Sequence, residues 1–133
     1  SRDMDRRIGE IMNKSVWTAL EDDTVERVEE LMSRHHLSSL PVVDARGSIF
    51  GIISSSDLLR FRERRGNPKS MHAWELCTYR PIEVNASATV MEVARLMIRH
   101  KIHHVVVTEN HKVAGFISAL DYVEQYLRHA PSK

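Results

Sequence analysis

The sequence lacks the features that usually mark secreted, membrane-spanning and nucleic-acid-binding proteins. It has a single cysteine, Cys77, which cannot form an internal disulfide, so we expect a reducing, cytoplasmic environment. Its apolar runs, such as Leu40-Pro-Val-Val43, are far shorter than the roughly 20 residues that cross a bilayer, and no signal-peptide pattern opens the chain. The 19 basic and 18 acidic residues nearly cancel, which gives no support for a nucleic-acid binder. We therefore expect neither a nucleic-acid partner nor a membrane segment.

Patterns typical of catalytic sites are also missing from the sequence. It has no Ser-His-Asp set, no Gly-rich phosphate loop and no HExxH motif. Cys77 ends a helix-like apolar stretch that begins at Trp74, which favours a packing role for its thiol. We therefore predict that the chain is not an enzyme. Its first residue is Ser1 and not methionine, which suggests a piece of a longer protein.

What the sequence does contain is one internal repeat. Residues 24–35 (TVERVEELMSRH) recur 65 positions later as residues 89–100 (TVMEVARLMIRH). After a one-residue deletion the offset becomes 64, and residues 51–57 (GIISSSD) recur as residues 115–121 (GFISALD). Chance is very unlikely to produce so many matches in one register, so the two halves should share one structure.

Each half is predicted to fold as β-α-β-β-α. The apolar residues of segment 25–32 have the spacing of a buried helical stripe, and the second copy repeats that spacing. Capping boxes are expected at the helix starts, from Thr89 with Glu92 and from Asp23 with Glu26. The deletion falls in the second hairpin, which then has the shorter turn. The expected strands are residues 16–20, 40–44, 48–53, 82–84, 104–108 and 112–117, and a second helix begins near residue 54 or 118 of each copy.

The predicted fold class is α/β (α+β), with two repeats that are related by pseudo-two-fold symmetry and share one core. Half of this chain would bury too little surface to be stable alone. We place the first repeat and an N-terminal helix at residues 1–62, a polar linker at residues 63–72 and the second repeat at residues 73–133. The N-terminal helix, with Ile8, Ile11 and Met12, is expected to pack across the other repeat.

A serine and an aspartate stand at each predicted strand-to-helix junction, Ser54 with Asp57 and Ser118 with Asp121. Two interpretations are open. The pair has the spacing of a helix cap, which needs no ligand. The same helix start also offers free N–H groups to a phosphate, and the carboxylate can accept from the two hydroxyls of a ribose. The exact duplication of the pattern adds weight to the ligand interpretation.

The order of these motifs resembles the CBS-domain (cystathionine beta-synthase domain) family. The residues on which the resemblance rests are Leu40-Pro-Val-Val-Asp44, a short turn and Gly51-Ile-Ile-Ser-Ser-Ser-Asp57, with a second copy about 65 residues later. The resemblance covers residues 11–127. It implies a tandem pair, or Bateman module, that binds an adenosyl ligand in clefts between the repeats and regulates an attached or separate effector protein. AMP, ADP and ATP are the favoured ligands, and S-adenosylmethionine and NAD are further candidates.

The resemblance also implies a role for individual residues. Ser54 and Ser118 would contact phosphate or ribose, and Asp57 and Asp121 would hold the ribose hydroxyls. Two further segments of each repeat would line the adenine slot: Val16, Trp17, Thr18, Ser38, Ser39 and Pro41 in the first copy, and Ile82, Glu83, His103 and His104 in the second. The family's symmetry predicts one site from Ser54, Asp57, Ile82, His103 and His104, and another from Ser118, Asp121, Thr18, Ser38 and Ser39.

The histidines near residue 100 have three interpretations. A metal site is disfavoured, because the cluster lacks cysteines and because His103 and His104 would point to opposite faces of a strand. A phosphate contact would make ligand binding tighter as the pH falls through the histidine range near ~6.5. His100 is explained equally well as a cation at a helix C-terminus.

A second function remains open, a structural dimerisation module with no bound ligand. The resemblance implies a homodimer that pairs through apolar helical faces. Residues on the predicted helices that could supply this face, or equally the core, are Leu58, Leu59, Tyr122, Val123 and Tyr126. The basic run at residues 60–65 is interpreted as the solvated face of a linker.

Overall fold

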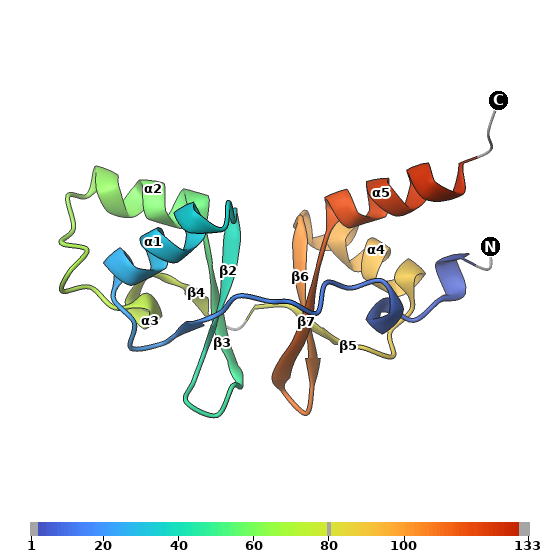
Figure 1. Cartoon of the computed structure of the whole chain (residues 1–133), viewed down its shortest axis with the longest axis horizontal. Coiled ribbons are helices and arrows are strands. Elements are labelled where there is room, and N and C mark those ends of the chain that lie inside the picture. The colour runs from blue at the N-terminus through green and yellow to red at the C-terminus, as the bar shows by residue number, and fades with distance from the viewer. Residues whose placement is uncertain (1–2, 80, 131–133) are drawn as a thin grey trace. The chain divides into compact units, whose positions relative to one another are not determined.

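The structure is a computed structural model that describes residues 3–79 and 81–130 (Figure 1). Its helices are α1 (Val25–Arg34), α2 (Ser55–Glu63), α3 (Ala73–Leu76), α4 (Val90–His100) and α5 (Ala119–His129), with short 3-10 turns η1 (Asp3–Asp5) and η2 (Ile8–Glu10). Its strands are β1 (Ala19–Leu20), β2 (Ser39–Val43), β3 (Ile49–Ser54), β4 (Thr78–Tyr79), β5 (Glu83–Asn85), β6 (His104–Glu109) and β7 (Lys112–Ser118).

The chain forms two compact units, each built on its own sheet. The first-repeat unit comprises residues 17–79, 81 and 111–113, and the second-repeat unit comprises residues 3–16, 82–110 and 114–130. The first sheet has the order β1-β2-β3-β4, with β1 parallel to β2 and the other neighbours antiparallel. The second has the order β5-β6-β7, with β5 parallel to β6. The duplicated α+β architecture predicted from the sequence is confirmed.

Each unit has its own cluster of buried hydrophobic residues. Val28, Leu40 and Ile53 are fully buried in the first-repeat unit, where the apolar stripe of α1 packs with β2 and β3. Val93 and Val105, the counterparts of Val28 and Leu40, are fully buried in the second-repeat unit. The sequence predicted one core shared by both repeats, whereas the buried residues form a cluster within each unit.

The helix starts follow the predicted pattern with one exception. Thr24, and not Asp23, caps α1, because the Thr24 hydroxyl accepts the backbone N–H of Arg27 at 3.2 Å. The Asp23 carboxylate instead accepts the backbone N–H of Leu20 at 2.8 Å, which closes the turn between β1 and the helix. The capping box predicted at Thr89 is confirmed.

The first strand of each repeat differs from the prediction. The strand expected at residues 16–20 begins only at Ala19, and the strand expected at residues 82–84 begins at Glu83 and ends at Asn85. The sequence did not predict β4, which pairs antiparallel with β3 opposite Gly51 and Ile52. A strand of two residues contains too little alternation to be recognised in the sequence.

Two short arms complete the units in matching ways. The N-terminal arm (residues 6–13) belongs to the second-repeat unit, where Ile8 is fully buried and its N–H donates to the carbonyl of Ala88 at 2.7 Å. The internal arm (residues 71–79) belongs to the first-repeat unit, where the N–H of buried Ala73 donates to the carbonyl of Asp23 at 2.8 Å. The expected packing of the N-terminal segment is therefore confirmed, and each unit contains the arm that precedes the other repeat in sequence.

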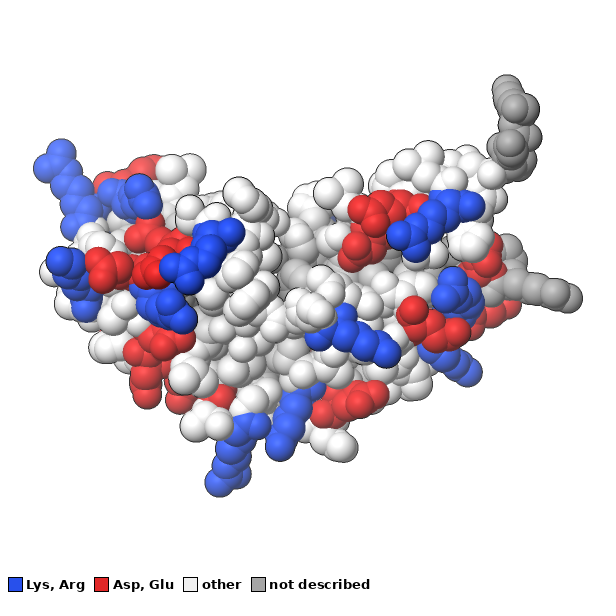
Figure 2. All heavy atoms as spheres, viewed as in Figure 1, with Lys and Arg blue, Asp and Glu red and all other residues white. Residues whose placement is uncertain are grey.

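Charges of both signs are mixed on the surface shown in Figure 2. Ion pairs connect some charged side chains of the described residues, as between Arg34 and Glu30 at 2.9 Å on α1. None of the helices within the described residues is long and apolar enough to cross a bilayer. On this face, therefore, positive and negative side chains lie close together, in keeping with the near-neutral net charge of the chain.

Candidate ligand-binding sites

In the first-repeat unit, Ser54 and Asp57 form a capping box where β3 leads into α2. The Ser54 hydroxyl accepts the N–H of Asp57 at 3.3 Å, and one carboxylate oxygen of Asp57 accepts from the Ser54 N–H at 2.8 Å and from its hydroxyl at 3.0 Å. Asp57 is only 5% exposed, and its second carboxylate oxygen pairs with the guanidinium of Arg60. Both oxygens of this carboxylate are therefore engaged by the protein.

In the second-repeat unit, Ser118 and Asp121 form the same capping box between β7 and α5. The Ser118 hydroxyl accepts the N–H of Asp121 at 3.3 Å, and the Asp121 carboxylate accepts the N–H of Ser118 at 2.7 Å. The residue at the position of Arg60 is Glu124, and no ion pair to Asp121 occurs among the described residues. The two helix starts share their backbone geometry and differ in the charge beside the carboxylate.

The segment before the second strand contacts the capping box of the same unit. In the first-repeat unit, the Ser55 N–H and hydroxyl both donate to the carbonyl of Ser38, at 2.9 and 3.2 Å, and Ser39 lies opposite Ser54 in the sheet register. In the second-repeat unit, the Ala119 N–H donates to the carbonyl of His103 at 2.9 Å. The structure thus brings Ser38 and Ser39 to one helix start and His103 to the other. The predicted grouping of residues from different repeats stays a prediction.

Comparison with known proteins decides the family of this chain. The family model described as CBS domain matches it twice, over residues 8–64 and residues 73–128. The chain belongs to the CBS-domain family. It is 27% identical over 116 residues to arabinose 5-phosphate isomerase KpsF of Escherichia coli, which covers 86% of this chain and 36% of that protein. It is 25% identical over 122 residues to hypoxic response protein 1 of Mycobacterium tuberculosis, which covers 91% of this chain and 85% of that protein. The CBS pair therefore spans about a third of the first relative and most of the second.

Solved structures resemble the CBS pair over almost its whole length. An uncharacterized conserved protein of Pyrococcus horikoshii has a TM-score of 0.83 at 26% identity, covering 98% of this chain and 99% of that chain. CBSX2, solved in complex with AMP, has a TM-score of 0.82 at 22% identity, with 92% and 96% covered. The CBS domain pair of MJ0100, solved with 5′-methylthioadenosine and S-adenosylmethionine, has a TM-score of 0.81 at 22% identity, with 92% and 97% covered. These likenesses agree with the α+β fold described above.

The remaining predicted residues of the CBS pair have varied surroundings. Val16, Trp17 and Thr18 precede β1, and the exposed indole of Trp17 stacks on the ring of His35 at 3.8 Å. Pro41 is fully buried within β2. Ile82 precedes β5, and the Glu83 carboxylate accepts from the hydroxyl of Thr108 at 2.8 Å.

Ser39 and His104 are the most informative of the predicted residues. Ser39 is buried, and its hydroxyl oxygen has no hydrogen-bond partner within the described part of the chain. His104 is half-buried and stacks on Phe116 at 5.3 Å. Burial lowers the pKa of His104, His103 lowers it further, and the nearby Asp121 carboxylate opposes both effects. A proton on His104 is thus disfavoured by the fold itself.

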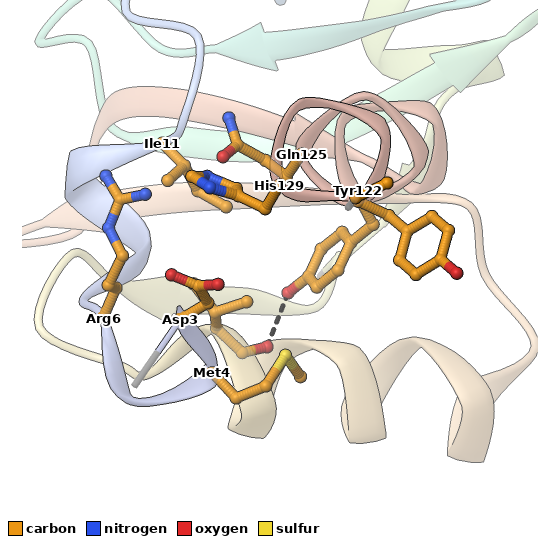
Figure 3. A pocket seen from close by; sticks show the side chains of 10 residues that line it. Asp3, Met4, Arg6, Ile11, Tyr122, Gln125 and His129 are labelled. Carbon is orange, nitrogen blue, oxygen red and sulfur yellow. Dashed lines mark hydrogen bonds between the residues drawn. The ribbon is translucent and has the colours of Figure 1, made fainter. Parts of the chain in front are cut away.

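Two features were missed or left aside by the sequence analysis. Arg60 was grouped with a solvated basic run, although its position three residues after Asp57 is the spacing of an ion pair on a helix. A cavity of about 440 Å³ lies between the N-terminal arm and α5, and Asp3, Arg6 and His129 are among its lining residues (Figure 3). There the Tyr122 hydroxyl donates to the carbonyl of Val90 at 2.7 Å, and burial raises the pKa of Tyr122 to about 12.

The single cysteine of the chain is partly buried, and burial disfavours its thiolate form. Cys77 is half-buried in the internal arm, beside Gly51 of β3. Burial raises the pKa of its thiol, so the reactive thiolate is disfavoured. This placement agrees with the packing role predicted from the sequence.

Proposed function

We propose that this CBS pair is a regulatory module that binds an adenosyl ligand, with AMP, ADP and ATP favoured, and that it performs no catalysis itself. The observation that carries the proposal is the duplicated serine and aspartate at the starts of α2 and α5. The structures of CBSX2 with AMP and of MJ0100 with 5′-methylthioadenosine and S-adenosylmethionine support this ligand class. S-adenosylmethionine and NAD remain further candidates.

In the proposed site the backbone binds the phosphate of the ligand, and side chains bind its ribose. The first N–H groups of α2 and α5 provide positive potential for a phosphate. The carboxylates of Asp57 and Asp121 are the acceptors for ribose hydroxyls, and Ser54 and Ser118 hold them in place through the capping boxes. The unpartnered hydroxyl of buried Ser39 is a polar group that a ligand or a water would satisfy.

The segments that precede β1 and β5 are proposed to line the adenine. They are Val16, Trp17 and Thr18 in one copy and Ile82 in the other, while the carboxylate of Glu83 is already engaged by Thr108. His103 and His104 are proposed to lie near the phosphate. Burial lowers the pKa of His104 below ~6.5, the ordinary value for a histidine. Any gain in phosphate affinity from its protonation is therefore expected only at a pH below that value.

The test is ligand binding by thermal shift and titration calorimetry with AMP, ADP, ATP, NAD and S-adenosylmethionine. We expect Asp121→Asn to weaken binding about tenfold or more, because a charge-assisted hydrogen bond is lost while the amide oxygen still caps α5. Asp22→Asn, at an exposed turn position after β1, is the matched control and should bind like the wild type. No response to any of the five ligands at millimolar concentration would overturn the proposal.

A second function, a homodimeric interaction module, is favoured by the exposed apolar face of α5. The exposed fractions are 71% for Leu120, 51% for Val123, 73% for Tyr126 and 66% for Leu127. Leu59 of α2 is also exposed, whereas Leu58 and Tyr122 pack against the cores. Light scattering of the wild type and of Val123→Asp tests it: a dimer that the substitution separates supports this face, and an unchanged oligomeric state contradicts it.

The comparisons also bear on the kind of protein that this CBS pair would regulate. The chain covers only 36% of the KpsF isomerase, so most of that protein lies outside the matched region, which is compatible with a covalently attached effector. Hypoxic response protein 1, of which the chain covers 85%, is the contrasting case, in which little else accompanies the matched region. We propose an effector, attached or separate, whose activity follows ligand occupancy of the CBS pair.

A further inference from the structure

The two helix starts of the CBS pair are duplicated in backbone, and among their differences is the charge three residues after the aspartate. Arg60 follows Asp57 by three residues on α2, and Glu124 follows Asp121 by three residues on α5. Residues three apart on a helix are neighbours on its surface. The same position therefore presents a cation to one carboxylate and an anion to the other.

At the first helix start both oxygens of the carboxylate have protein partners. One oxygen of Asp57 accepts two hydrogen bonds from Ser54, at 2.8 and 3.0 Å, and the other pairs with Arg60. The side chain of Asp57 is 7% exposed, and the oxygen that the capping box does not use is the one that pairs with Arg60. The side chain of Arg60 is 58% exposed, so the guanidinium can leave without disturbing the core.

At the second helix start the carboxylate keeps an acceptor. The Asp121 carboxylate takes the N–H of Ser118 at 2.7 Å, and within residues 3–79 and 81–130 no cation forms an ion pair with it. Glu124 cannot donate to it and repels further negative charge. A carboxylate has about four acceptor positions, so the hydroxyls of a ribose find free ones here.

We propose that Arg60 masks Asp57, so that the CBS pair binds its first adenosyl ligand at the Asp121 helix start. Arg60 is thus a specificity-determining residue that makes the two copies unequal. This inference rests on the proposed function, because it concerns which of the two sites is used. It does not require the two sites to differ in backbone geometry, and the capping box of α2 does not involve Arg60.

The experiment is titration calorimetry with AMP on the wild type and on Arg60→Gln, Glu124→Arg, Asp57→Asn and Asp121→Asn. For the wild type we expect one tight AMP per chain, which Asp121→Asn weakens about tenfold or more and Asp57→Asn leaves in place. Arg60→Gln should add a second AMP per chain. Glu124→Arg should create the mask at Asp121 and weaken the tight site.

The matched control is Arg62→Gln, which removes a neighbouring arginine of α2 that pairs with Glu29 and not with Asp57. It should bind AMP as the wild type does, and circular dichroism of each variant verifies that it folds. Two results would overturn the masking. One is that Asp57→Asn loses the tight binding of AMP. The other is that Arg60→Gln binds AMP more weakly than the wild type or with an unchanged stoichiometry. Absence of binding by every variant and by the wild type instead removes the proposed function, and the inference with it.

Discussion

The glycine of each Gly-x-x-Ser-x-x-Asp motif leads to a prediction about stability. A Cβ atom at Gly51 would lie 2.6 Å from the Sγ of Cys77 and 2.6 Å from the backbone carbonyl oxygen of Thr78, both in the internal arm. Ordinary contacts begin near 3.4 Å, so Gly51→Ala needs a displacement of about 0.8 Å. The carbonyl cannot rotate away, because β4 is paired with β3 at this point.

The counterpart in the second-repeat unit differs in what the new methyl group meets. A Cβ atom at Gly115 would lie 2.3 Å from the Sδ of Met12, which is closer than any contact at Gly51. All three of its nearest atoms belong to the Met12 side chain, which can adopt another rotamer. We therefore expect Gly51→Ala to lower the free energy of unfolding by about 2–3 kcal/mol and Gly115→Ala by about 1 kcal/mol, within the range for overpacked sites.

Urea unfolding followed by circular dichroism and by tryptophan fluorescence measures both effects. Trp17 and Trp74 both lie in the first-repeat unit, so fluorescence reports that unit. Cys77→Ala in the Gly51→Ala background should restore only part of the loss, because the Thr78 carbonyl remains in place. A larger loss for Gly115→Ala than for Gly51→Ala would refute the reasoning, since it would mean that contact distance outweighs the flexibility of the neighbour.

Three smaller predictions follow from single contacts. Thr24→Ala should lower the free energy of unfolding by about 1 kcal/mol through loss of the cap of α1, and a loss no larger than that of a surface control contradicts it. Tyr122→Phe should cost about 1 kcal/mol through the lost bond to Val90, measured by urea unfolding. Because the folded state holds the pKa of His104 below ~6.5, the unfolded chain binds the proton first, and stability should fall as the pH drops below that value. His104→Phe should flatten this part of the profile of melting temperature against pH, and an unchanged profile argues against it.

The sequence predicted the elements that carry a periodic pattern. The apolar stripes of α1 and α4 face their sheets as their spacing indicated, and the duplication placed both at once. The capping residue predicted for α1 was wrong because the side chains of two adjacent residues, Asp23 and Thr24, can each accept a backbone N–H. Only the path of the chain after β1 decides which of them faces the helix, and that path depends on the parallel pairing of β1 with β2.

Features made by contact between distant segments could not be predicted in detail. β1 and β4 are two-residue strands that exist because β2 and β3 offer them hydrogen-bond partners. In the matching arms, Met12 and Cys77 are 65 residues apart, which is the offset of the repeat, and they occupy equal positions against Gly115 and Gly51. The duplication thus extends to packing contacts that no local sequence pattern predicts.

The capping and ligand interpretations of the Ser-x-x-Asp motif are compatible, because a carboxylate has two oxygens. The cap uses one oxygen of Asp57 and one of Asp121 for the serine N–H. Whether a ribose can bind then depends on the second oxygen, which Arg60 occupies in one copy and no described cation pairs with in the other. The motif by itself therefore predicts a well-formed helix start, and we propose that the residue three positions after the aspartate determines whether that helix start also binds a ribose.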